Sequence, residues 1–183
     1  MKFLQYLFIS LSHKILKLLP YTSIRILSVP IGTLYFLLTF RSSIKLFKRK
    51  EIFNELKINY KPLIVKINYT RYWLETLWLT NKNFSKYISP HVEIENLEYV
   101  EKLKKQYPGL IFALPHLGNW EFAIPIGNSI KLNLLAVAEP LNNSYVLNWF
   151  KSLRESLGIE IIIGGKGQNT FDLLVNKLKS GKD

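Results

Sequence analysis

Three short apolar runs, each ended by a turn and followed by a helical stretch, constrain the fold of this chain most strongly. They are residues 110–114, 134–138 and 159–163. Short apolar runs bounded by turn residues are typical of buried strands, and their alternation with helices predicts an α/β fold. The chain has 183 residues, enough for a domain with a real core. We therefore expect a central mixed sheet flanked by helices.

The first run leads into a stretch in which a histidine and a carboxylate lie five residues apart. The stretch reads Pro115-His116-Leu117-Gly118-Asn119-Trp120-Glu121. Asn119 is a suitable N-cap for a helix over residues 120–126, whose positive dipole end would keep the His116 imidazole neutral. Glu121 is placed one turn into that helix, where a carboxylate can orient the ring. His116 and Glu121 are thus candidates for a general base and its orienting acid.

The same spacing also fits a plain structural histidine, and on spacing alone this alternative stays open. His91 begins a predicted edge strand over residues 91–95, where a solvent-facing structural role is expected for it. The loop 164–167 has neither a P-loop nor a dinucleotide-binding pattern, so a simple turn is expected there. The chain contains no cysteine, which excludes a disulfide, a thiolate nucleophile and a Cys-ligated metal. We expect neither a metal nor a cofactor.

Positive charge is concentrated in the N-terminal third of the chain. Residues 1–66 carry twelve Lys and Arg against two Glu, a net charge of +10 out of +12 for the whole chain. Such an asymmetry indicates an anionic partner, either a nucleic acid or an acidic membrane surface. Long aliphatic runs lie between these charges, and the sequence has no nucleic-acid-binding signature. A membrane surface is therefore favoured over nucleic acid.

Two N-terminal segments have the pattern of membrane-associating helices. Residues 4–19 have apolar side chains at helical spacing with basic residues mostly on the other side, and residues 26–40 contain no charge. Fifteen helical residues cover about 22 Å, less than the roughly 30 Å of a hydrocarbon core. We expect residues 1–50 to associate with the membrane, peripherally or by shallow insertion, and residues 51–183 to form part of an α/β domain. The alternative is a buried helix followed by a solvated charged loop.

Three stretches of the sequence resemble a known family. His116-Leu-Gly-Asn-Trp-Glu121 resembles the motif of the bacterial lipid A late acyltransferase family. Val137-Ala138-Glu139 and Arg154-Glu-Ser-Leu-Gly158 look most like the actinobacterial phosphatidylinositol mannoside acyltransferase branch of that family. That branch usually has Asp where Glu121 stands, whereas the lipid A branch has Glu.

The resemblance implies a role for each of these residues. His116 would be the catalytic base and Glu121 its partner. Glu139 would border the acceptor pocket and Arg154 would be a cation beside the acyl donor. The backbone at Gly118 and Asn119 is also expected to contact substrate, through N–H groups placed to stabilise an oxyanion.

The function implied is transfer of a fatty acyl group from an acyl thioester to a hydroxyl of a membrane glycolipid of the phosphatidylinositol mannoside type. The donor is acyl-CoA or acyl carrier protein, and the location is the cytoplasmic face of the cell membrane. The alternatives are a lipid A or lysophospholipid acceptor, or a non-catalytic membrane-binding fragment. Because the resemblance stops near Asp183, the chain is expected to be truncated, with an incomplete sheet and little or no activity.

Overall fold

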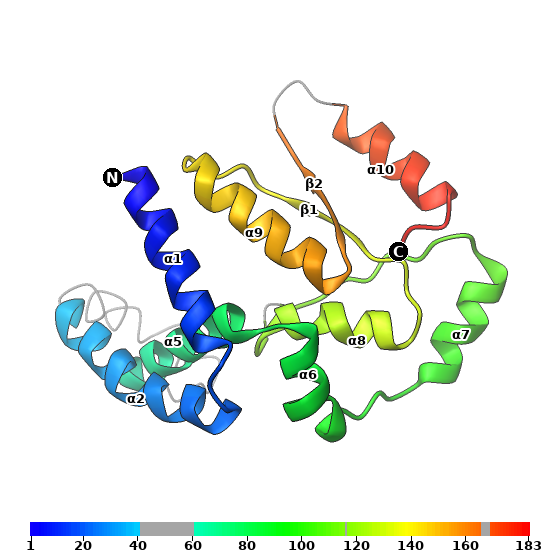
Figure 1. The fold of residues 1–183 in the computed structure, drawn as a ribbon. Coiled ribbons are helices and arrows are strands. Elements are labelled where there is room, and N and C mark those ends of the chain that lie inside the picture. The colour runs from blue at the N-terminus through cyan, green and yellow to red at the C-terminus, as the bar shows by residue number, and fades with distance from the viewer. Residues whose placement is uncertain (41–60, 116, 166–168) are drawn as a thin grey trace, which may run out of the picture. The chain divides into compact units, whose positions relative to one another are not determined.

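The computed structural model describes residues 1–40, 61–115, 117–165 and 169–183 (Figure 1). These residues form two compact units, one of Met1–Ser12 with Leu79–Asp183 and the other of His13–Trp78. Helix α1 (Lys2–Leu16) begins in the first unit and ends in the second. The predicted boundary between residues 50 and 51 lies outside the described residues.

The larger unit contains helices and a short sheet. In chain order its elements after α1 are α6 (Asn81–Tyr87), η1 (Ser89–His91), α7 (Leu97–Gln106), η2 (Trp120–Phe122), α8 (Ala123–Ser129), β1 (Leu135–Ala138), α9 (Ser144–Leu157), β2 (Glu160–Ile163) and α10 (Thr170–Lys179). The strands are parallel, with Leu135 opposite Glu160 and Ala138 opposite Ile163. Helix α9 is the crossover between them, as parallel strands require.

Helix α9 has clear start and stop signals. The Asn143 side chain accepts hydrogen bonds from the backbone N–H groups of Tyr145 and Val146, at 3.2 and 3.4 Å. Gly158, with φ 102°, ends the helix in a left-handed conformation that favours glycine. A side chain there would also collide with Asn128, because an added Cβ would lie 2.4 Å from its Nδ2. The helix predicted over 144–157 is confirmed.

The core of the larger unit brings together helices that are distant in sequence. Leu79, Phe84, Ile124 and Leu157 are all buried and pack in one cluster. Phe84 belongs to α6, in a stretch (81–90) that the sequence predicts to be a polar linker. That prediction was wrong, because Thr80 caps the helix by accepting from Asn83 N (3.1 Å) and the Phe84 ring is buried.

The smaller unit is built mainly from two antiparallel helices, α2 (Tyr21–Leu38) and α5 (Pro62–Trp78). They approach most closely at Gly32, where an added Cβ would lie 2.6 Å from the Ile67 Cα. At the start of α2 the Tyr21 hydroxyl donates to Glu75 Oε1 at 2.8 Å. Trp78 Nε1 donates to the Leu19 carbonyl at 2.9 Å. These two hydrogen bonds anchor the end of the pair where α2 begins and α5 ends.

The structure corrects the expected sheet. Strands β1 and β2 confirm two of the predicted strands, whereas residues 110–114 are irregular, and Ile111 is 84% exposed. An apolar run becomes a strand only when a neighbouring backbone completes its hydrogen bonds, and no strand among the described residues pairs with this one. The α/β alternation is therefore present, but the expected mixed central sheet is limited here to one parallel pair.

Candidate active site

Glu121, the last residue of the motif, lies in the short helix η2, and its side chain is almost fully buried. The backbone N–H of Glu121 donates to Asn119 Oδ1 at 3.1 Å, so Asn119 caps the turn as the sequence predicted. The side chain of Glu121 is only 2% exposed. A buried carboxylate needs charged or hydrogen-bonding partners to compensate for the loss of water.

Arg154, in the last turn of α9, supplies that partner. Its Nη2 donates to Oε1 of Glu121 at 2.7 Å, and its Nε donates to Oε2 at 3.1 Å. This two-pronged geometry is the strongest arrangement for an arginine and a carboxylate. The ion pair joins the end of the motif to α9. The sequence did not predict this pairing.

Two aromatic rings hold the Arg154 guanidinium in place. Its central carbon lies 4.8 Å from the centre of the Trp120 ring and 5.8 Å from that of Phe150. Both distances lie within the range of a cation–π contact. Arg154 is thus packed among motif and α9 side chains, with its side chain 18% exposed. The sequence interpretation placed it beside an acyl donor, and that role stays a prediction.

His116 itself lies outside the described residues, so its predicted pairing with Glu121 stays a prediction. The residues on either side of it, Pro115 and Leu117, are exposed, and the Leu117 N–H donates to the Pro115 carbonyl at 2.8 Å. Gly118 has φ 61°, a conformation that few residues other than glycine adopt. The Gly-Asn turn therefore connects an exposed segment to a buried carboxylate.

The carboxyl ends of the two strands lie at one edge of the sheet. Glu139 directly follows β1 and is exposed, while Gly164 follows β2 and donates its N–H to the Ala138 carbonyl at 3.0 Å. Ligands of open α/β sheets commonly bind beyond such strand ends. Residues 166 and 167 of the glycine loop lie outside the described part of the chain. Among the residues that the structure does describe, no cluster of His, Asp and Glu could hold a metal ion.

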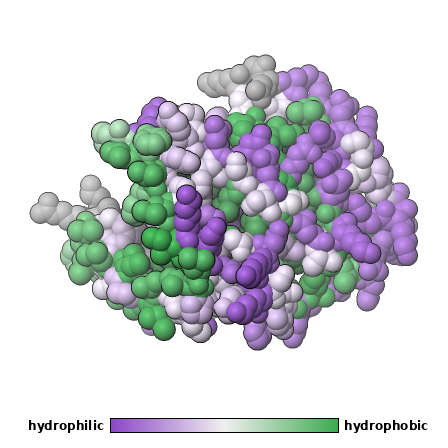
Figure 2. Space-filling view, viewed as in Figure 1, coloured by the Kyte–Doolittle hydropathy of each residue, from purple (hydrophilic) through white to green (hydrophobic). Residues whose placement is uncertain are grey.

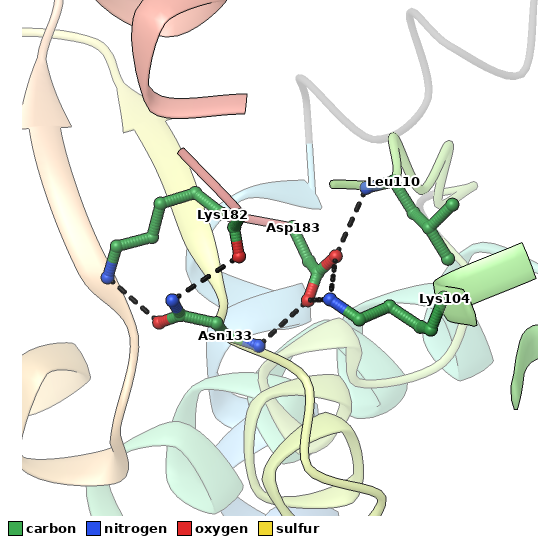
Figure 3. A network of polar contacts seen from close by, with 6 residues as sticks. Lys104, Leu110, Asn133, Lys182 and Asp183 are labelled. Atoms are coloured by element: carbon green, nitrogen blue, oxygen red, sulfur yellow. Dashed lines mark hydrogen bonds and ion pairs between the residues drawn. The ribbon is translucent and has the colours of Figure 1, made fainter. Parts of the chain in front are cut away.

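A second buried carboxylate, which the sequence analysis missed, holds the start of the segment that leads to the motif. The Asp183 side chain accepts from Lys104 Nζ at 2.6 and 2.8 Å, from the Leu110 backbone N–H at 3.1 Å and from the Asn133 backbone N–H at 2.9 Å (Figure 3). Nearby, Gly109 lies so close to the C-terminal turn that an added Cβ would be 2.2 Å from the Lys182 carbonyl oxygen. The entrance to the motif segment is therefore fixed at Leu110.

The backbone of Asp183 also continues the sheet pattern. Its N–H donates to the Asn133 carbonyl at 2.9 Å, and its carbonyl accepts from the Leu135 N–H at 2.7 Å. This is the pattern of a parallel bridge, on the edge of β1 away from β2. No sequence motif indicates this network, because its members are ordinary polar residues that only the fold brings together.

Comparison with known proteins places these features in a family. The model of the bacterial lipid A biosynthesis acyltransferases matches residues 2–182. Phosphatidylinositol mannoside acyltransferase of Mycobacterium tuberculosis (strain CDC 1551 / Oshkosh) is 29% identical over 118 residues, which are 63% of this chain and 37% of that protein. The enzyme of the same name from Mycolicibacterium smegmatis is 27% identical over 119 residues, 63% of this chain and 38% of that protein.

The match thus spans little more than a third of the length of these relatives. No solved structure matches the chain significantly. The family predicted from His116-Leu-Gly-Asn-Trp-Glu121 is confirmed, since the family model covers nearly every residue: this chain belongs to the bacterial lipid A biosynthesis acyltransferase family.

Proposed function

We propose that this chain belongs to a membrane-associated acyltransferase that moves a fatty acyl group from an acyl thioester to a hydroxyl of a membrane glycolipid. The family supports acyl transfer to a lipid, and the similar relatives favour an acceptor of the phosphatidylinositol mannoside type. The structural observation that carries the proposal is the buried carboxylate of Glu121, the last residue of the motif, which pairs with Arg154. A carboxylate fixed in this way is suited to orient a neighbouring imidazole.

In the proposed reaction His116 removes the proton from the acceptor hydroxyl. The hydroxyl oxygen attacks the thioester carbonyl, and the tetrahedral intermediate collapses to an ester and a thiolate. The thiolate then takes up the proton from the imidazolium, so that base and acid roles belong to the same ring. Backbone N–H groups at Gly118 and Asn119 would stabilise the oxyanion.

We assign a positioning role to Arg154 in this scheme. Its Nε and Nη2 atoms bind both Glu121 oxygens, which fixes the plane of the carboxylate. A lone pair that these contacts leave on the carboxylate is the proposed acceptor for the His116 ring. Glu139, exposed at the end of β1, is the proposed acceptor-side residue. The donor is acyl-CoA or acyl carrier protein, and the reaction needs no cofactor.

A membrane location follows from the surface of α1. Its exposed apolar side chains include Phe3, Leu4, Leu7, Phe8 and Leu11. A basic helix with such a surface is suited to the headgroup layer of an anionic bilayer. Among the described residues, α2 alone is long and apolar enough to cross a membrane by length and composition. We propose peripheral or shallow attachment on the cytoplasmic face.

One observation favours the non-catalytic alternative. The segment that leads to the motif exposes Ile111, Leu114 and Leu117 and pairs with no described strand. A site that depends on such a segment is weakly preorganised, and preorganisation is what catalysis requires. A membrane-binding fragment without activity is therefore the second candidate.

Transfer of a labelled palmitoyl group from palmitoyl-CoA distinguishes these candidates. Phosphatidylinositol mannoside, a lipid A precursor and a lysophospholipid would be offered in vesicles as separate acceptors. With the full-length protein we expect product with the mannoside, and a loss of about 10²–10⁴-fold in His116→Ala, as is usual for a general base. Glu155→Gln is the matched control, because Glu155 is an exposed carboxylate on α9 paired with Lys151. A loss below tenfold in His116→Ala would refute the base assignment.

A further inference from the structure

Helices α2 and α5 both expose apolar side chains, although they are packed together. On α2 these are Ile26, Val29, Ile31, Leu34, Leu37 and Leu38, and on α5 they are Leu63, Ile64, Val65, Tyr69 and Trp73. The packing side of the pair is already occupied, because Ile24, Ser28 and Trp78 are buried within it. In Figure 2 hydrophobic side chains gather at the left, where Figure 1 places α2. This surface is larger than scattered apolar residues would give.

Part of this surface forms one continuous face. The rings of Tyr35 and Tyr69 stack across the two helices with their centres 6.2 Å apart. Ile31, Leu34 and Leu38 flank Tyr35 on α2 at helical spacing, and Val65 and Trp73 flank Tyr69 on α5 at intervals of four residues. These seven residues, called here the α2/α5 face, therefore lie on one side of the helix pair.

The chemistry of the face fits a lipid surface better than a protein partner. Tyr69 and Trp73 lie with their ring centres 6.2 Å apart, and both residue types prefer the membrane–water interface. Lys66 Nζ lies 4.3 Å from the centre of the Tyr35 ring, which places a cation at the edge of the face. Residues 1–66 carry a net charge of +10, which is complementary to anionic headgroups.

The polar residues of α5 decide between spanning and lying flat. Helix α5 packs along α2 and carries Lys66, Arg71 and Glu75, and Glu75 accepts a hydrogen bond from Tyr21. Carrying these groups into the hydrocarbon beside α2 would be energetically unfavourable, because charged side chains there lose their hydration. Lying in the interface avoids this cost, because the polar residues then stay at headgroup level while the apolar face meets the acyl chains.

We propose that α2 and α5 form a joint lipid-facing surface, the α2/α5 face, which lies flat on an anionic bilayer. The surface extends the membrane association proposed for residues 1–50 to a helix outside that segment. It does not depend on acyl transfer.

The cysteine-free sequence allows a direct test. Single-cysteine variants Leu34→Cys and Val65→Cys would carry an environment-sensitive fluorophore, and Tyr99→Cys on α7 is the control at an exposed aromatic residue. The probes are vesicles of phosphatidylcholine with and without phosphatidylglycerol. We expect the emission of the labels at residues 34 and 65 to shift to the blue with the anionic vesicles only. Quenchers placed at one shallow depth in the bilayer should quench both labels. The emission of the label at residue 99 should not change.

Three outcomes would overturn the proposal. An emission shift at residue 34 without one at residue 65 would confine lipid contact to α2. The absence of a shift at both residues would show that neither helix contacts lipid. Labels at Ile26→Cys and Leu38→Cys separated in depth by about 18 Å, the rise of twelve helical residues, would show that α2 spans the bilayer.

An unlabelled pair of variants provides a second measurement. Val65→Ser should weaken binding to anionic vesicles by about tenfold, whereas Tyr99→Ser should leave it unchanged. Equal affinities of the two variants, with helical content intact, would also refute the proposal. Because these readouts measure membrane contact alone, they are independent of the His116→Ala result.

Discussion

Arg154, in the last turn of α9, binds both carboxylate oxygens of Glu121, the last residue of the motif. The pair is nearly closed to solvent, so each charge depends on the other. Removing one partner of such a pair leaves an uncompensated buried charge, which costs far more than the net contribution of the intact pair.

Replacing Arg154 by Met should therefore destabilise the chain by about 3–5 kcal/mol. Arg154→Lys should recover only part of this, because an ammonium group cannot form the two-pronged contact. The free energy of unfolding in urea measures both effects. The double variant Arg154→Met/Glu121→Gln is the control, and it should be more stable than Arg154→Met alone. If the single variant were as stable as the parent chain, the pair would not be buried as described.

The Asp183 network predicts a local effect at the start of the motif segment. Asp183→Ala removes the acceptor of the Leu110 and Asn133 amides and the partner of Lys104, and should cost about 1–3 kcal/mol. Hydrogen exchange at the Leu110 amide should accelerate more than exchange in α9. Asp172→Ala, which alters an exposed acidic residue on α10, is the matched control. Uniform acceleration throughout the chain would contradict a local role.

The close contact of α2 with α5 predicts that Gly32→Ala destabilises the smaller unit. The new Cβ would lie 2.6 Å from the Ile67 Cα, and helix backbones must separate to admit it. A cost of about 1–3 kcal/mol is typical of overpacking. Gly165→Ala serves as the control, since no atom lies within 4 Å of its added Cβ. Thermal unfolding followed by circular dichroism should show a lower midpoint for Gly32→Ala alone.

His13 gives the smaller unit a pH dependence near neutrality. Burial lowers the pKa of His13 below 6.5, while its Nδ1 lies 2.7 Å from the Leu77 carbonyl. Below pH 6.5 the unfolded chain binds more protons at this residue than the folded chain does, so stability falls as the pH is lowered through this range. The variant His13→Asn keeps a donor for Leu77 without a titrating group. Its unfolding midpoint should depend less on pH below 6.5.

Local patterns predicted the elements whose signals are contained in their own residues. Helix α9 has its cap at Asn143 and its stop at Gly158, and strands β1 and β2 are short apolar runs that each find the other as a partner. Asn119 likewise caps its turn as predicted, because an N-cap needs only the next two or three residues.

Long-range partners are what the sequence could not supply. The run 110–114 is as apolar as β1, yet without a neighbouring backbone it stays irregular. The pairing of Arg154 with Glu121 was not predicted, because helical spacing does not show where a guanidinium turns and Glu121 lies on a different element. Phe84 was overlooked because a single aromatic residue in a polar stretch gives no periodic signal.

The bidentate ion pair between Arg154 and Glu121 has a consequence for protein engineering. A graft of the six-residue motif onto another scaffold would carry the acid without its counter-ion, since the arginine comes from the crossover helix. The smallest transplantable unit is therefore the motif together with the strand–helix connection after it. Exchanging Glu121 for the shorter Asp would likewise have to be matched by a shift of that helix.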